Sequence, residues 1–136
     1  MSGSAALYAL VGFGSVIGGV LRALASLASL ALLGPAFPWG TLFANTLGSF
    51  VIGFYATLTG PEGRLFARTA ERQFVMAGIC GGFTTFSMFS LETLRLIQGR
   101  TPGLAVLYVL VSLAAWLGAV VVGHLLAGRL NRLGGS

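Results

Sequence analysis

Asparagine 45 stands in an apolar segment with a hydroxyl side chain one helical turn away on either side. Thr41 and Ser49 lie at i−4 and i+4, so on a helix the three residues form one polar stripe. An amide in hydrocarbon that finds no partner costs several kcal/mol. Asn45 therefore either joins two helices through a hydrogen bond or lines a polar pathway along this stripe.

Arg22 lies well inside the first apolar segment of the chain. A charge at such a position costs about 2.5–3.5 kcal/mol on insertion scales and marks a functional candidate. No acidic residue occurs in the first two apolar segments to neutralise it. Two interpretations stay open: the long side chain reaches the membrane interface, or the guanidinium serves an anion pathway.

The run "GGFTTFSMFS" at residues 81–90 disfavours a continuous helix. Two adjacent glycines cost roughly 2 kcal/mol against Ala in a helix interior, and Thr84 and Thr85 add hydroxyls that compete for the backbone. The run predicts a break around residues 81–85. Carbonyls freed inside a membrane need a partner, which is another helix, water or a cation.

Beyond the expected break, Phe86 and Phe89 are spaced i, i+3 and share a helix face, with Thr85 and Ser90 beside them. Aromatic ring edges carry partial positive charge. Two such edges beside hydroxyls and the Asn45 amide would make a weak, dehydrated anion site. The alternative is an aromatic helix face that only packs.

Two further groups of polar side chains follow. Tyr108, Ser112 and Trp116 are spaced i, i+4, i+8 and share one face of the last apolar segment. Glu92 and Arg95 are spaced i, i+3 near the end of the third, which predicts a mutually neutralising pair close to the lipid headgroups.

The elements that position these residues are four apolar segments. Of the 136 residues, 56% are hydrophobic and 8% are charged, against about a quarter charged in a soluble domain. The chain is therefore expected to be an all-α integral membrane protein with a single domain over 1–136. Helices are predicted at about 5–33, 39–59, 74–97 and 104–130, each longer than the ~20 residues needed to cross a bilayer, with both termini on one side.

Arginine supplies all eight basic side chains, against three acids. Most of them fall in short loops and tails, which favours phospholipid headgroups over nucleic acid as their neighbours. The side that holds both termini carries five arginines and the other side two, which favours cytoplasmic termini. The five are Arg64, Arg68, Arg72, Arg129 and Arg132, and the two are Arg95 and Arg100.

Small residues recur at four-residue spacing and allow helix backbones to approach closely. The pairs are Gly14 with Gly18, Ala44 with Gly48, and Ala119 with Gly123. A bundle of four helices has no room for a wide pore, so a transport path is expected to need a second copy. Cys80, the only cysteine, is expected to be a small buried residue, and His124 an interfacial residue rather than a proton relay.

Three sequence runs carry a family resemblance. "GGFTTFSMFSLE" (81–92) resembles the signature of the Fluc (CrcB-like) fluoride channels, "WGTLFANTLGSF" (39–50) resembles their second-helix motif, and "GGVLR" (18–22) their first-helix glycines and arginine. The resemblance covers essentially the whole chain. It implies four transmembrane helices with helix 3 broken near its middle, and an antiparallel, dual-topology homodimer in the bacterial plasma (inner) membrane.

The resemblance also implies a function. The protein would be a passive, fluoride-selective channel that exports cytoplasmic fluoride and protects against its toxicity, and it would not be an enzyme. A structural sodium ion at the dimer interface would be held by the main-chain carbonyls of Gly81 and Thr84. Met88 and Trp116 depart from the usual family pattern. The residues assigned to the fluoride pathway are Phe86, Phe89, Asn45, Ser112, Tyr108, Thr85 and Arg22.

Other functions fit the sequence less well. A small multidrug-type, proton-coupled antiporter needs a membrane-embedded carboxylate, and the only acid near a helix is Glu92, towards the end of its segment. A scaffold subunit would not need Asn45, Arg22 and the phenylalanine pair on matched faces. An enzyme would need a nucleophile–base pair or a metal-ligand cluster, which the sequence does not contain.

Overall fold

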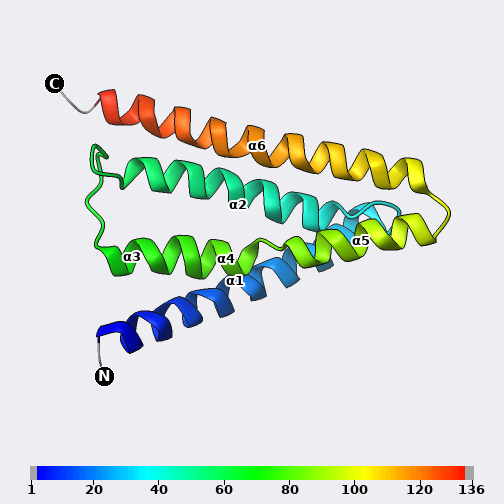
Figure 1. Cartoon of the computed structure of the whole chain (residues 1–136), viewed down its shortest axis with the longest axis horizontal. Helices are drawn as coiled ribbons and strands as arrows, with labels where there is room; N and C mark the ends of the chain where they lie inside the picture. The colour runs from blue at the N-terminus through cyan, green and yellow to red at the C-terminus, as the bar shows by residue number, and fades with distance from the viewer. Residues whose placement is uncertain (1–2, 134–136) are drawn as a thin grey trace.

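A computed structural model describes residues 3–133 and is helical almost throughout. Four of its helical segments are long and apolar enough to cross a membrane, which confirms the predicted all-α, multi-span architecture. They are α1 (Gly3–Leu33), α2 (Trp39–Leu58), the segment from Thr69 to Gln98, and α6 (Pro102–Leu133). The two described chain ends lie at the same end of the molecule (Figure 1).

The third segment consists of several short elements. It begins with α3 (Thr69–Gln73) and continues as a π-helix, η1 (Phe74–Cys80), and as α4 (Gly81–Phe83), before α5 (Phe86–Gln98). The helix begins before the predicted start at 74 because Glu71 caps it, its Oε2 accepting from the backbone N–H of Arg68 at 2.9 Å. Between α4 and α5, Thr84 and Thr85 have extended backbones, with φ/ψ of −83°/156° and −154°/124°.

Helix α1 packs on the third segment through glycines. Gly14 and Gly18 are its only buried residues among those described. A Cβ placed on Gly18 would collide with the carbonyl oxygen of Ile79, and one on Gly82 would collide with that of Ser15. The absence of side chains at these positions therefore brings α1 against the end of η1 and α4, directly before the extended residues.

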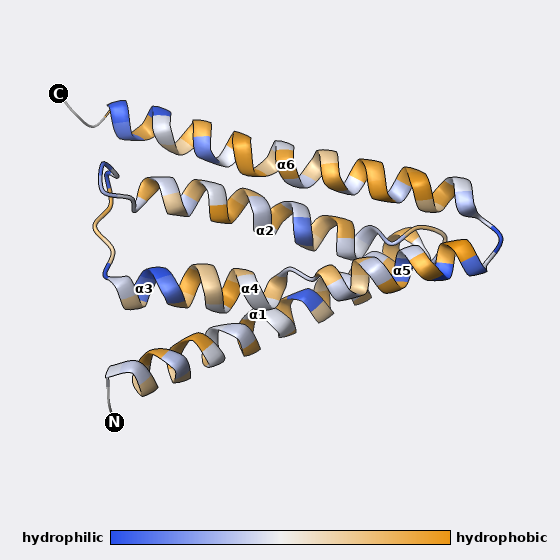
Figure 2. Ribbon diagram, in the orientation of Figure 1, coloured by the Kyte–Doolittle hydropathy of each residue, from blue (hydrophilic) through white to orange (hydrophobic). Residues whose placement is uncertain are grey.

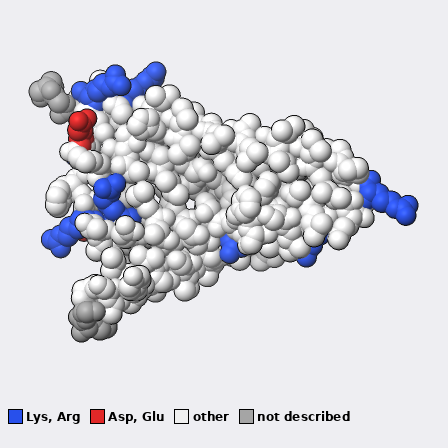
Figure 3. All heavy atoms as spheres, in the orientation of Figure 1, with Lys and Arg blue, Asp and Glu red and all other residues white. Residues whose placement is uncertain are grey.

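Helices α2 and α6 lie side by side along most of their length (Figure 1). A Cβ on Gly53 would meet Val120 of α6, and one on Gly123 would meet Phe50 of α2. The described core is small and includes Ala44, Tyr108 and Ala127, each fully buried. Figure 2 shows that apolar residues make up much of the long helices, many of whose large apolar side chains are exposed, and Figure 3 shows that arginines gather mainly at the two ends. This distribution fits a chain embedded in lipid.

Candidate functional site

The extended residues between α4 and α5 are held by the side chain of Asn45 from α2. Asn45 is 5% exposed. Its Oδ1 accepts from the backbone N–H of Thr85 at 2.7 Å, and its Nδ2 donates to the backbone carbonyl of Thr85 at 2.9 Å. The amide thus satisfies both backbone groups of Thr85, an extended residue between two helices, which removes the cost of leaving them unpaired.

Side chains around the break satisfy other groups that a continuous helix would pair. The Nε of Arg22 donates to the carbonyl of Gly82 at 3.2 Å. Thr85 caps α5, its Oγ1 accepting from the backbone N–H of Met88 at 3.2 Å, as a hydroxyl residue does at a helix N-terminus. Thr84 Oγ1 donates to the carbonyl of Cys80 at 3.0 Å. The two threonines therefore support the interruption chemically.

These bonds divert the amides that Gly81 and Thr84 would meet in a regular helix. A carbonyl accepts from the N–H four residues later, which would be Thr85 for Gly81 and Met88 for Thr84. The Thr85 N–H is directed to Asn45 and the Met88 N–H to the Thr85 hydroxyl. The two carbonyls predicted to hold sodium are thus those whose usual donors are used elsewhere.

The two phenylalanines lie in different environments. Their ring centroids are 5.5 Å apart, but Phe86 is 69% exposed whereas Phe89 is 6% exposed. Phe89 contacts two rings of α6, those of Tyr108 at 5.2 Å and Trp116 at 4.8 Å between centroids. Phe89 therefore joins the phenylalanine pair to the polar face of α6.

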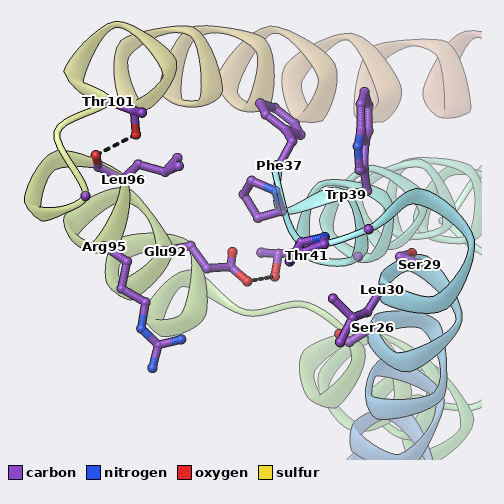
Figure 4. A pocket seen from close by; sticks show the side chains of 15 residues that line it. Ser26, Ser29, Leu30, Phe37, Trp39, Thr41, Glu92, Arg95, Leu96 and Thr101 are labelled. Atoms are coloured by element: carbon purple, nitrogen blue, oxygen red, sulfur yellow. Dashed lines mark hydrogen bonds between the residues drawn. The ribbon is translucent and has the colours of Figure 1, made fainter.

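Glu92 is paired differently from the sequence prediction. Its Oε1 accepts from Thr41 Oγ1 and its Oε2 from Tyr108 Oη, each at 2.8 Å. Among the described residues, no ion pair joins Glu92 to Arg95, so that prediction is wrong. The reason is that the side chain of Glu92 turns toward the start of α2 and that of Arg95 turns away from it (Figure 4). The sequence had marked Thr41 and Tyr108 as polar-face residues but not as donors to this carboxylate.

The polar stripe of α2 runs between two cavities. Thr41 lines the larger one, of about 470 Å³, together with Glu92 and Arg95 (Figure 4). Asn45 and Ser49 line the smaller one, of about 230 Å³. The smaller cavity is also lined by Ile52, Thr84, Thr85, Phe86 and Trp116. One face of α2 thus contributes polar residues to both cavities.

The remaining predicted site residues lie around this arrangement. Tyr108 and Ser112 are both fully buried on α6. Arg22 lines neither of the two cavities and contacts the break from the α1 side. His124 lies apart from the site, its Nδ1 2.8 Å from Thr57 Oγ1. The described residues contain no group of three or more His, Cys, Asp or Glu side chains that could hold a metal ion, so a cation here would need main-chain ligands.

Comparisons with known proteins agree with the motifs. Residues 9–124 match the family model described as CrcB-like protein, Camphor Resistance (CrcB). The chain is 60% identical to a Rhodopseudomonas palustris protein named fluoride-specific ion channel FluC 1, over 97% of this chain and 94% of that one. It is 57% identical to a Bradyrhizobium diazoefficiens protein of the same name, over 96% and 90%. It is 48% identical to fluoride-specific ion channel FluC of Opitutus terrae, over 96% and 98%.

Proposed function

Because this chain belongs to the CrcB-like family, we propose that it forms a channel through which fluoride leaves the cell passively, down its electrochemical gradient. It is a multi-pass membrane protein and a fluoride-specific channel rather than an antiporter or an enzyme. By this function it limits fluoride toxicity.

The proposed pathway is supported mainly by the polar stripe of α2, whose residues line two cavities. Fluoride holds water tightly, so a selective path must replace that water with hydrogen-bond donors at close range. Asn45 keeps a second N–H beyond the one it donates to Thr85. Ser49, Thr85 and Phe86 line the same cavity as Asn45. We assign the route to these groups together with Phe89, Tyr108, Ser112 and Arg22.

A second copy of the chain would complete this route. Phe86 is 69% exposed although it lines the smaller cavity, and Phe89 is the only buried residue of α5 among those described. A wall that is open on one side cannot exclude lipid or water from an ion. An antiparallel homodimer, with lipid around it, would place a second α5 and α6 against this open face and give two equivalent pathways.

The same dimer would place a structural sodium ion at its centre. The carbonyls of Gly81 and Thr84 have lost their usual donors, and two copies would offer four hard oxygen ligands on a two-fold axis. We expect this ion to stay bound while fluoride passes. A high-resolution density map of the dimer tests this, and carbonyls that point apart with no density between the subunits would reject it.

The function is tested by anion efflux from liposomes that contain the purified full chain. A fluoride electrode should record rapid release of fluoride, and a chloride electrode should record no release above that of empty liposomes. Equal release of both anions would refute selectivity. Fluoride release that requires an imposed proton gradient would favour the antiporter instead.

A further inference from the structure

Trp116 of α6 carries a hydrogen-bond donor that nothing in the described chain accepts. Its Nε1 is buried and has no hydrogen-bond partner among the described residues. An indole N–H can only donate, and a buried donor without an acceptor is destabilising because it has lost its hydrogen bond to water. Its position therefore calls for an acceptor that the described chain does not supply.

The surroundings of Trp116 favour an anion as that acceptor. Trp116 lines the smaller cavity with Asn45 and Thr85, and no acidic side chain lines it. The indole meets the ring of Phe89 edge to face, with an angle of 72° between their planes. Because the N–H is shielded from solvent, an ion that accepts from it would have given up part of its own hydration.

Ser112 supports the same conclusion from one helical turn away. Its Oγ is also buried without a partner among the described residues, and Ser112 is fully buried. Residues at i and i+4 share a helix face, so two donors that lack acceptors among the described residues lie on the face of α6 from which Tyr108 and Trp116 contact Phe89. A small anion is one ligand that could accept from both.

We propose that the indole N–H of Trp116 donates a hydrogen bond to dehydrated fluoride as it moves between the smaller cavity and Ser112. Trp116 is then a selectivity-determining residue of this chain's pathway. The inference rests on the proposed function and adds one donor to it. A bulky side chain at this point narrows the path and also supplies the group that replaces water.

Tryptophan fluorescence tests the contact without relying on transport. The chain has two tryptophans, so Trp39→Phe leaves Trp116 as the only one. Fluoride added to this protein should change its emission in a saturable way, and chloride at the same ionic strength should not. The matched control is Trp116→Phe, which leaves only Trp39 and should show no fluoride-dependent change. The proposal is overturned if fluoride does not change the emission of Trp116, or if chloride changes it to the same extent.

Efflux measurements test the role of the donor. Trp116→Phe keeps an aromatic ring but removes the N–H, and should lower fluoride efflux by at least about tenfold, because a hydrogen bond to a charged group is lost. Trp116→His, assayed at pH 8 where the ring is neutral, keeps a ring N–H and should retain most of the efflux. Leu117→Ala, at a neighbouring position that is 66% exposed, should match the parent.

The outcomes separate this inference from the proposed function. If Trp116→Phe passes fluoride at the parent rate, the indole N–H acts only in packing, with a weak contact to the face of Phe89, and the proposal is wrong. If the parent itself passes no fluoride, the proposed function fails regardless of Trp116. The fluorescence titration of Trp39→Phe keeps residue 116 unchanged and is compared with chloride in the same protein, so it remains decisive if Trp116→Phe does not fold.

Discussion

Asn45 shows how one side chain can hold a backbone segment in place and still keep a donor for the proposed fluoride route. It pairs with both backbone groups of Thr85, which holds the extended residues between α4 and α5 against α2. A hydroxyl donates and accepts through a single oxygen, so it lacks the amide's separate donor and acceptor atoms, and its one hydrogen would leave none for an anion. The structural interpretation and the pathway interpretation of this amide are therefore compatible, since one N–H is still available.

We predict that Asn45→Leu lowers the free energy of unfolding by roughly 2 kcal/mol or more and reduces fluoride efflux. Two buried backbone groups lose their partners, each costing about 1–3 kcal/mol. The matched control is Thr46→Val on the same helix, because Thr46 Oγ1 is buried without a partner among the described residues and its removal should cost little. Thermal unfolding in detergent measures the stability of both variants. Equal losses of stability in Asn45→Leu and Thr46→Val would contradict the pairing of Asn45 with the Thr85 backbone.

The phenylalanine pair gives a second prediction at this scale. Phe86→Ile and Phe89→Ile should both lower fluoride efflux sharply, because each removes a ring edge from the route. Only Phe89→Ile should also lower the unfolding temperature, since Phe89 is buried against Tyr108 and Trp116 whereas Phe86 is exposed in one chain. Efflux at the parent rate in either variant would remove that ring from the pathway.

At the scale of the elements, the third segment is shaped by its neighbours as much as by its own residues. The glycines of "GGFTT" are helical, and the extended residues are the two threonines after them. Gly82 allows α1 to approach, since a Cβ there would collide with Ser15. The glycines therefore position α1 against the interruption, and the hydroxyls and Asn45 satisfy its backbone.

Two adjacent glycines of α1 give a matched prediction for this packing. A Cβ on Gly18 would collide with the carbonyl of Ile79, whereas one on Gly19 would have no atom within 4 Å. Gly18→Ala should thus destabilise the fold and lower fluoride efflux by moving α1 away from α4. Gly19→Ala should leave efflux unchanged and raise stability by up to about 1 kcal/mol, because Ala favours helix. Thermal unfolding and fluoride efflux are measured for both variants. If Gly18→Ala and Gly19→Ala have the same stability and the same efflux, α1 does not pack closely at Gly18.

At the scale of the whole molecule, the proposed pathway would be open along one side of a single chain. The exposed ring of Phe86 and the apolar outer faces of α1 and α6 need lipid or another copy to cover them. The arginine distribution favours cytoplasmic termini, whereas an antiparallel dimer needs chains of both orientations. We favour the antiparallel dimer, because its two-fold axis would bring two interruptions together at mid-membrane around one cation, whereas a parallel dimer could do so only if both lay on an axis along the membrane normal.

A blocker applied to single channels tests the orientation. An antiparallel dimer presents the same surface on both sides of the membrane, so a protein blocker raised against an extramembrane loop should act equally from either side. We expect this symmetry in every channel that is recorded. Block from one side only, in randomly inserted channels, would mean that the two subunits are parallel.

Sequence alone determined the membrane-spanning architecture and the family. The apolar segments are long enough to fix four helices by composition, and "GGFTTFSMFSLE" is specific enough to indicate the function, which the relatives support. Helical spacing also placed Tyr108, Ser112 and Trp116 on one face, because the 3.6-residue period is a local property.

The tertiary structure alone decided which groups meet across helices. The carboxylate of Glu92 accepts hydrogen bonds from Thr41 and Tyr108, which lie 51 and 16 residues away in the sequence. The local spacing of Glu92 and Arg95 had predicted the wrong partner. Likewise, no local pattern pairs Asn45 with the Thr85 backbone, or leaves Trp116 Nε1 without an acceptor. Local spacing fixes which face a side chain occupies, but the rotation and approach of whole helices, set here by glycine contacts, fix what that face touches.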